Sequence, residues 1–156
     1  MEPTVLFVCV SNAGKSQMAA ALLRDISHGR VHVVSAGTQP GEHLNGESVA
    51  SLGAIGVSVE GEYNKPVTEE MLRAADRVIM VGPNAQLPEL TGVQVERWLP
   101  DEPSERGIQG RERMDLLRDD LAERARVLFA ELEPDLPPVP EPPAEPERMD
   151  PEDEEF

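Results

Sequence analysis

Apolar residues along the chain form two kinds of pattern, continuous runs and stretches with helical spacing. A continuous apolar, β-branched run is typical of a strand that is buried on both faces, and strong helix formers directly after one favour a helix. These patterns predict strands over residues 4–10, 31–34, 77–81 and 93–99. They predict helices over residues 17–25, 48–55, 68–75 and 114–132.

Local signals at the helix ends support this division. Gly56 follows the helix 48–55 where a left-handed C-cap is needed, and Thr68 is a suitable N-cap for the helix 68–75. Because strands and helices alternate, the sequence predicts an α/β fold: an open four-stranded parallel sheet with helices on both faces. Ligands of such folds bind beyond the carboxyl ends of the strands, and Cys9 lies at one of these ends.

The last 24 residues differ in composition from the rest. Residues 133–156 contain eight prolines, ten acidic residues and one arginine, which disfavours helix, sheet and core alike. We therefore predict one folded domain over residues 1–132 and a disordered, acidic, proline-rich tail over residues 133–156. Such a tail keeps a protein soluble; the alternative is an acidic docking peptide.

Charge and hydropathy exclude several classes of partner. The net charge is −16, of which the predicted tail contributes −9, and an acidic chain is repelled by nucleic-acid phosphates and by anionic membrane surfaces. The sequence has no apolar run of about 18 residues and no signal-peptide pattern. We expect a cytoplasmic protein that binds neither nucleic acid nor a membrane.

Cys9 is the single cysteine, and the three histidines His28, His32 and His43 are scattered along the chain. One cysteine forms no internal disulfide, and this set of residues has no metal-ligand spacing. We therefore expect no bound metal or other cofactor. Twelve arginines stand against two lysines, a bias that we interpret as that of a high-GC bacterial genome.

Residues 9–16, CVSNAGKS, join the end of a predicted strand to the start of a predicted helix. Small residues and residues that tolerate a positive φ let successive backbone amides turn inward as a nest, and the helix N-terminus adds its dipole at the same point. We therefore predict an oxyanion-binding loop. Its members are Val10, Ser11, Asn12, Ala13, Gly14, Lys15 and Ser16.

Four residues of this stretch have expected chemical roles. Cys9 is expected to be a thiolate and the nucleophile, because a helix N-terminus and a nearby cation favour the ionised sulfur. Ser16 donates its hydroxyl to that sulfur, Asn12 pins the loop, and Lys15 neutralises the oxyanion. The alternative for Cys9 alone is a small buried hydrophobe at a strand end. Gly14-Lys15-Ser16 also matches the end of a Walker-type phosphate loop, but Cys9 occupies the place of the first glycine, which disfavours nucleotide binding.

The stretch VLFVCVSNAGKSQMA at residues 5–19 resembles the active-site region of the low-molecular-weight protein tyrosine phosphatases and of the arsenate reductases that share their fold. Further matching stretches are SAGT (35–38), LNGESV (44–49), KPVT (65–68), ADRVIMVG (75–82) and ERW (96–98). The resemblance covers residues 4–132. Within this superfamily the chain is most similar to the actinobacterial arsenate reductases that use mycothiol, the arsenate-mycothiol transferases.

Three features distinguish the chain from the phosphatase pattern. Lys15 stands where phosphatases carry an arginine that clamps the phosphoryl group bidentately. The loop that supplies the general acid in the family aligns with Glu102-Pro103, and no tyrosine follows it to stack on an aryl substrate. We expect Glu102, or the less well aligned Asp101, to protonate the departing oxygen. The alternative is that both belong to a solvated acidic turn.

The resemblance implies that arsenate binds in the loop, where Cys9 and Lys15 hold and activate it. Thioredoxin-coupled arsenate reductases need two further cysteines, which this chain lacks. The implied cosubstrate is therefore mycothiol or another low-molecular-weight thiol, and the implied protein partner is a separate redoxin. The arginines Arg106, Arg111 and Arg113 are candidates for drawing an anionic cosubstrate to the site, or they pair with nearby acids.

Two rival hypotheses use the same loop. The first is a phosphatase that hydrolyses phosphomonoesters through a cysteinyl-phosphate on Cys9, with Glu102 or Asp101 as the acid. The second is a protein that binds an oxyanion without turning it over. We expect an arsenate reductase that uses an external thiol, on the basis of Lys15, the single cysteine and the missing tyrosine.

Overall fold

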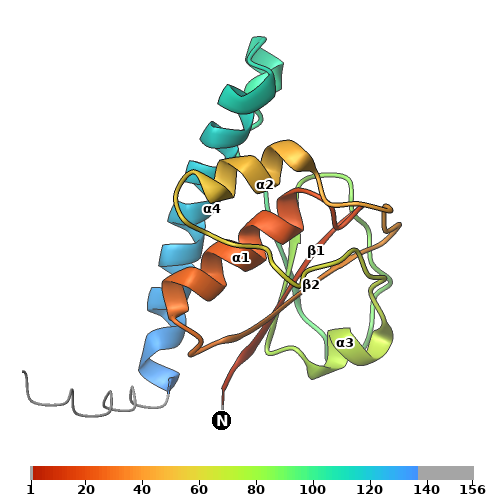
Figure 1. The fold of residues 1–156 in the computed structure, drawn as a ribbon. Helices are drawn as coiled ribbons and strands as arrows, with labels where there is room; N and C mark the ends of the chain where they lie inside the picture. Colours follow the sequence, from red (N-terminus) through yellow and green to blue (C-terminus); the bar gives the residue numbers. More distant parts are fainter. Residues whose placement is uncertain (1, 137–156) are drawn as a thin grey trace, which may run out of the picture.

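The computed structural model describes residues 2–136 as an open sheet flanked by helices (Figure 1). The strands are β1 (Thr4–Cys9), β2 (His32–Gly37), β3 (Arg77–Val81) and β4 (Val95–Trp98). The α-helices are α1 (Lys15–Ser27), α2 (Gly46–Gly53), α3 (Glu69–Ala74) and α4 (Gly110–Leu132). Two short 3-10 helices, η1 (Pro103–Arg106) and η2 (Glu133–Asp135), precede and follow α4.

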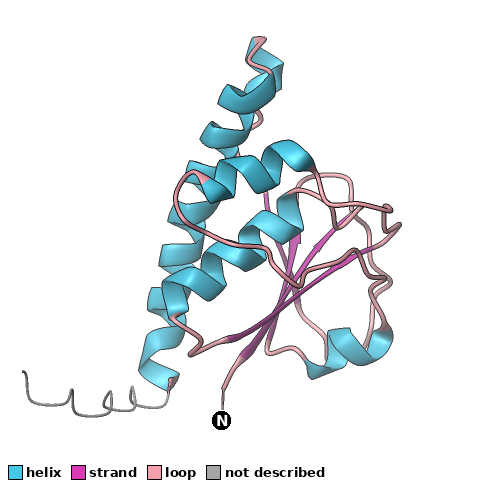
Figure 2. Ribbon diagram, viewed as in Figure 1, coloured by secondary structure: helices cyan, strands magenta, loops and turns pink. Residues whose placement is uncertain are grey.

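The sheet confirms the predicted α/β fold. Its four strands are parallel and lie in the order β2-β1-β3-β4. Helices cover both faces: α1, α2 and α4 lie on one face, and α3 lies on the other (Figure 2). The strand order reverses beside β1, so the carboxyl end of β1, at Cys9, opens at the switch point where ligands of such sheets bind.

Successive side chains of β1 enter two different cores. Val5 and Phe7 face the larger core, which α1, α2 and α4 complete, whereas Leu6 and Val8 face the smaller core beside α3. This alternation is the two-residue period of a strand. All four side chains are at most 1% exposed. Packing on both faces therefore fixes the position of Cys9 at the end of the strand.

Several element boundaries differ from the predictions, each for a local reason. β1 ends at Cys9, because Val10 already belongs to the following loop. α2 begins at Gly46 rather than at residue 48, since the side chain of Asn45 accepts a hydrogen bond from the Ser48 amide (3.0 Å) and caps the helix. α4 begins at Gly110 rather than at residue 114. The prediction missed the first turn because this turn is polar and lacks the apolar spacing of the rest of the helix.

The two predicted capping residues have different outcomes. Thr68 caps α3, with its Oγ1 accepting a hydrogen bond of 3.1 Å from the Met71 amide. α2 ends at Gly53, before the predicted end at residue 55, and Gly56 follows with a φ of 78°. The left-handed conformation expected at Gly56 is therefore present, but it closes the turn after the helix rather than the helix itself.

The first residues of the predicted tail belong to the fold. η2 covers Glu133–Asp135, and the partly buried Leu136 packs against the larger core. The fold thus continues past the predicted boundary at residue 133, because Leu136 gains an apolar contact that proline and acid content alone do not reveal. Residues 137–156, the remainder of the predicted disordered tail, lie outside the described residues.

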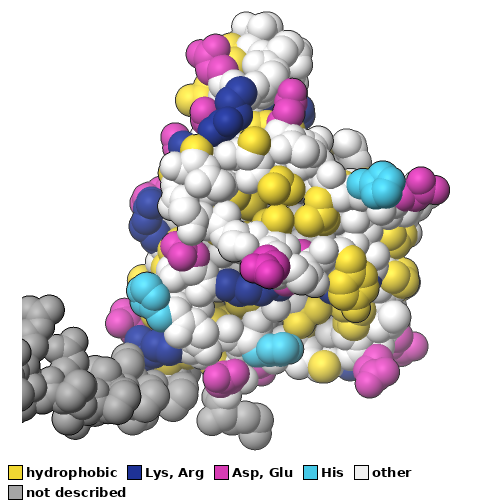
Figure 3. Space-filling model, in the orientation of Figure 1, with side chains coloured by type: hydrophobic (Ala, Val, Ile, Leu, Met, Phe, Trp, Pro, Cys, Tyr) yellow, Lys and Arg dark blue, Asp and Glu magenta, His cyan; other side chains and the backbone are white. Residues whose placement is uncertain are grey.

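Charges of both signs are mixed on the surface. On the face in Figure 3, Lys and Arg side chains lie among Asp and Glu side chains rather than in one basic patch. Among residues 2–136, no helix combines the length and the apolar character that crossing a membrane requires.

Candidate active site

The loop 9–16 contains the last residue of β1, the connecting residues 10–14 and the first two residues of α1, and it folds around the end of the strand. The carbonyl groups of Cys9, Val10, Ser11 and Ala13 accept backbone hydrogen bonds of 2.8–3.0 Å from the segment 38–45. Carbonyl groups that point outward in a tight loop leave the amides on its inner side. The loop therefore has the geometry of an amide-lined nest.

The N-terminus of α1 points its free amides into the same nest. Its N-cap residue, Gly14, makes no side-chain cap, and the first turn carries no acidic residue. Within residues 2–136, the amides of Ser11, Gly14 and Lys15 have no hydrogen-bond acceptor. Unsatisfied amides and the positive end of the helix dipole together favour an anion at this point.

A glycine beneath the loop allows it to lie close to the sheet. A Cβ atom at Gly37 would lie 2.7 Å from the carbonyl oxygen of Val10 and 3.0 Å from the amide nitrogen of Asn12. Backbone atoms at such distances leave no room for a side chain. Gly37 ends β2 in register with Cys9. The glycine thus sets the height of the loop above the strand ends.

Asn12 holds the loop through both ends of its side chain. The residue is fully buried and has a φ of 53°, a left-handed conformation that asparagine tolerates better than most residues. Its Oδ1 accepts a hydrogen bond from the amide of Lys65 (3.1 Å), which orients the side-chain amide so that Nδ2 donates to Ser16 Oγ (2.8 Å). Asn12 therefore connects the loop to the segment at residue 65 and to α1.

The sulfur of Cys9 lies at the end of this network. Ser16 Oγ lies 2.9 Å from Cys9 Sγ, and the Asn12 amide donates to the same sulfur at 3.2 Å. Since Ser16 Oγ already accepts a hydrogen from Asn12 Nδ2, its own hydrogen is free to point at the sulfur. Two donors thus converge on Cys9 Sγ, the arrangement that stabilises a thiolate.

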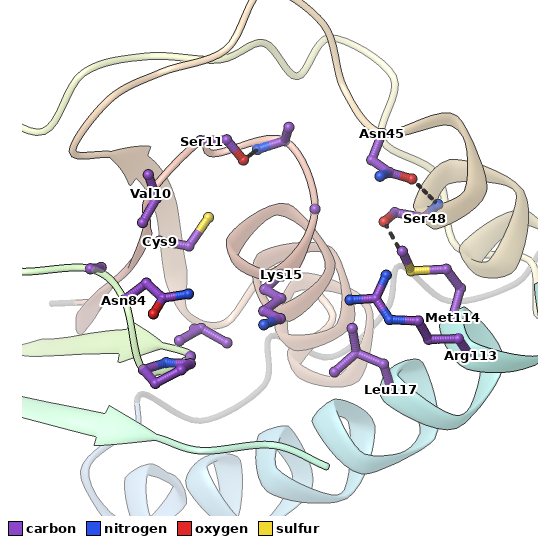
Figure 4. A pocket seen from close by; sticks show the side chains of 16 residues that line it. Cys9, Val10, Ser11, Lys15, Asn45, Ser48, Asn84, Arg113, Met114 and Leu117 are labelled. Atoms are coloured by element: carbon purple, nitrogen blue, oxygen red, sulfur yellow. Dashed lines mark hydrogen bonds between the residues drawn. The ribbon is translucent and has the colours of Figure 1, made fainter. Parts of the chain in front are cut away.

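A cavity of about 250 Å³ opens above the loop. Figure 4 shows Cys9, Ser11 and Lys15 on one side of it, Asn84 on another, and Arg113, Met114 and Leu117 of α4 across from them. The Lys15 side chain passes close to Gly82: a Cβ atom added at Gly82 would lie 3.4 Å from Lys15 Nζ. The cavity therefore brings a sulfur, an amide nest and two cationic side chains to one space.

Glu102 does not line the cavity, but it forms ion pairs with both cationic side chains that do. Its carboxylate accepts two hydrogen bonds from Arg113, at 2.5 and 2.9 Å, and lies 3.8 Å from Lys15 Nζ. The hydrogen bonds from Arg113 lower the pKa of Glu102 to about 2. In this arrangement Glu102 is ionised at neutral pH, which opposes the role of proton donor that the sequence suggests.

Asp101, the second candidate acid, is exposed and pairs with Arg106 at 2.6 and 2.8 Å. The hydrogen bonds from Arg106 lower the pKa of Asp101, so this carboxyl group is also ionised at neutral pH. It does not line the cavity. Asp101 thus matches the alternative of a solvated acidic turn.

Of the three candidate arginines, one lines the cavity and two do not. Arg106 pairs with Asp101 and Arg111 pairs with Asp115 (2.8 Å), both away from the cavity, whereas Arg113 lines it. Sequence reasoning gave no role to other lining residues, because they come from elements far apart in the chain. They include Asn45 and Ser48, which lie in the matching stretch 44–49, and Asn84, Met114 and Leu117. Within residues 2–136, no three His, Cys, Asp or Glu side chains are placed to hold a metal ion.

Comparison with known protein families agrees with the resemblance found at residues 5–19. Residues 4–135 match the family described as low molecular weight phosphotyrosine protein phosphatase. The chain belongs to this family. The matched range contains every element of the sheet and every residue of the cavity described above.

Proteins named as arsenate reductases are similar to this chain. A Halobacterium salinarum protein named "Putative arsenate reductase" is 32% identical over 135 residues, which are 83% of this chain and 92% of that protein. The thioredoxin-dependent arsenate reductase of Corynebacterium glutamicum superposes with a TM-score of 0.72 at 30% identity. The match covers 86% of this chain, but this chain spans only 63% of the length of the Corynebacterium chain.

A further solved structure is similar to this chain. An arsenate reductase in a phosphate-binding state superposes with a TM-score of 0.71 at 26% identity, over 83% of this chain and 98% of that one. In the present member of the family, the cationic residue of the loop is Lys15, and a guanidinium reaches the same cavity from α4 as Arg113.

Proposed function

We propose that this chain is an arsenate reductase that transfers arsenate, bound in the loop 9–16, to mycothiol. The observation that carries the proposal is the position of Cys9 Sγ: it accepts hydrogen bonds at the base of an amide nest that Lys15 flanks. A tetrahedral oxyanion fits such a nest. The similarity to arsenate reductases supports arsenate as the substrate.

In the first step, Cys9 thiolate attacks the arsenic atom. A sulfur–arsenic bond forms, one arsenate oxygen leaves as water with protons from the arsenate and the solvent, and arsenic stays As(V). Loop amides and Lys15 bind the remaining oxygens and offset their charge. Glu102 is ionised in this arrangement, so it is not assigned a proton transfer.

In the second step, the thiol group of mycothiol attacks arsenic and displaces Cys9. The sulfur leaves as a thiolate because the Ser16 hydroxyl and the Asn12 amide stabilise its charge. The product is an arseno-mycothiol adduct, still As(V). A separate redoxin then supplies two electrons through its thiol, which releases arsenite and leaves mycothiol in a mixed disulfide.

The single cysteine supports an external thiol rather than an internal relay. An intrachain disulfide needs two cysteines, so the redox partner has to meet the arsenic adduct outside this chain. The thioredoxin-dependent relative from Corynebacterium supports a thiol-based partner without identifying which thiol this chain uses. Low-molecular-weight thiols are kept reduced in the cytoplasm, where we propose that the protein works.

The test is a reconstituted assay of the full chain with arsenate, mycothiol, a mycoredoxin and its reducing system. We expect arsenite formation that depends on mycothiol and on Cys9. Glutathione and thioredoxin in place of mycothiol serve as controls for the identity of the thiol. Hydrolysis of an aryl phosphate without arsenite formation would overturn the proposal.

Phosphomonoester hydrolysis is the second candidate, and the family match favours it. The same loop would form a cysteinyl-phosphate on Cys9, which water would hydrolyse. Lys15 is a point charge without the planar fork that clamps a phosphoryl group, and this opposes efficient phosphoryl transfer. Binding of phosphate without turnover in either assay would instead favour an oxyanion-binding protein.

A further inference from the structure

Three charged side chains from separate parts of the chain meet beside the cavity. Arg113 directs its Nε and Nη2 at the two carboxylate oxygens of Glu102, at 2.9 and 2.5 Å. Lys15 Nζ lies 3.8 Å from the oxygen that receives Nη2. Each of these side chains is about one quarter exposed. An oxyanion, the carboxylate of Glu102, is thus already bound by both cations.

The two cations face the cavity, whereas Glu102 does not line it. In Figure 4 the guanidinium of Arg113 reaches from α4 toward the middle of the view, where Lys15 lies. Lys15 belongs to the loop and α1, and Arg113 belongs to the first turn of α4. The cluster has a net charge of +1 while Glu102 is in place, and this rises to +2 when Glu102 moves away.

A guanidinium and an ammonium differ in what they recognise. The planar fork of an arginine binds two oxygens of a carboxylate, phosphate or arsenate at once, whereas a lysine offers one compact charge. The loop itself carries only Lys15. Arg113 is the guanidinium that lines the cavity, and its fork is aligned for two oxygens, as its contact with Glu102 shows.

We propose that Arg113 is a binding residue for the oxyanion substrate and that Glu102 occupies its fork until the substrate arrives. This inference rests on the proposed function only in that an arsenate-like oxyanion enters the loop. The substrate displaces the Glu102 carboxylate and receives the two hydrogen bonds of Arg113. Glu102 thereby acts as an internal competitor, which weakens binding of any oxyanion that does not fill the nest.

Two substitutions are expected to change the affinity for oxyanions in opposite directions. Arg113→Gln removes the fork and weakens binding of inorganic phosphate and arsenate by about tenfold to a hundredfold, the value of a charged hydrogen bond. Glu102→Gln removes the competing charge and tightens binding by roughly threefold to tenfold, the value of a partly exposed ion pair. In an Arg113→Gln background, Glu102→Gln gives a much smaller gain, because the fork that it would free is absent.

The experiment is calorimetric titration of full-length wild type, Arg113→Gln, Glu102→Gln and the double variant with inorganic phosphate and with arsenate. No thiol is present. Arg111→Gln is the matched control, because Arg111 lies in the same turn of α4, pairs with Asp115 and does not line the cavity. We expect its affinity to equal that of the wild type. Thermal unfolding of each variant accompanies the titrations, so that loss of folding is not mistaken for loss of binding.

Two results would overturn the inference. One is an Arg113→Gln protein that is folded and binds both anions as the wild type does, which would leave Arg113 with a purely structural contact to Glu102. The other is a Glu102→Gln protein whose affinity is unchanged or lower. Because no thiol or turnover enters the measurement, these results are independent of whether arsenate is reduced.

Discussion

The loop 9–16 and the charged pair Glu102–Arg113 lie close together, but they are built in different ways. The loop is contiguous, and its residues Asn12 and Ser16 are fully buried in a network of backbone and side-chain hydrogen bonds. The charged pair comes from two separate elements, is joined by ion pairs, and is about one quarter exposed. The inner region, the loop 9–16, is therefore preorganised, whereas the outer region, the pair Glu102–Arg113, is held by ion pairs that can exchange partners and so adjust affinity.

The largest expected effect comes from the inner region. Cys9→Ser removes the nucleophile while keeping a hydrogen-bonding group of similar size, so we expect turnover of arsenate to fall by ~1,000-fold or more. Phosphate binding persists because the amide nest is unchanged. Steady-state assays and calorimetry on the same preparation check both parts. Turnover that survives in the variant would remove Cys9 from the mechanism.

The substitution Asn12→Ala is expected to have the next largest effect. The variant loses the hydrogen bonds to Ser16 and from Lys65 and places alanine at a φ of 53°, so we expect a loss of about 2–4 kcal/mol of stability and a tenfold or larger loss of turnover. Asn12→Gly separates the causes, because glycine accepts this φ but lacks the amide. Urea unfolding and turnover assays measure both. Equal behaviour of Asn12→Gly and the wild type would show that the network is dispensable.

A smaller effect is expected from the outer region as pH changes. The pKa of Glu102 is about 2 in the fold against an ordinary value of 4.5, so its pairing with Arg113 stabilises the protein fully above pH 4.5. That contribution is lost as the pH falls from 4.5 through about 2. The difference in unfolding free energy between the wild type and Glu102→Gln should therefore shrink over this range, by less than about 1 kcal/mol because the pair is partly exposed. Urea unfolding at a series of pH values measures it; a constant difference would contradict the pairing.

The smallest effect is expected at Asp101. Its partner Arg106 lies away from the cavity, so Asp101→Asn should leave arsenate turnover and phosphate affinity within about twofold of the wild type. Steady-state turnover assays and calorimetry measure the two quantities. A large fall in turnover with unchanged affinity would instead restore Asp101 as the proton donor and would break the distinction between the two regions.

The sequence could predict features that depend on neighbouring residues, but not features that depend on packing between distant elements. The strands, the order of elements and the loop depend on local patterns, and the run before Cys9 indicates a strand buried on both faces. The pairing of Glu102 with Arg113 depends on how η1 packs against α4, which no local pattern encodes. Asn84 and Met114 reach the cavity for the same reason. Leu136 likewise packs on the core from a segment whose composition predicts disorder.

The most direct test of the central claim uses the single cysteine. Full-length protein is treated with iodoacetamide at neutral pH, and alkylation of Cys9 is followed by mass spectrometry while arsenate or phosphate is titrated at constant ionic strength. An oxyanion held in the amide nest above the sulfur should slow alkylation in a saturable manner, with the same midpoint as in calorimetry. If both anions bind and the rate of Cys9 alkylation does not change, the oxyanion site lies elsewhere and the account fails.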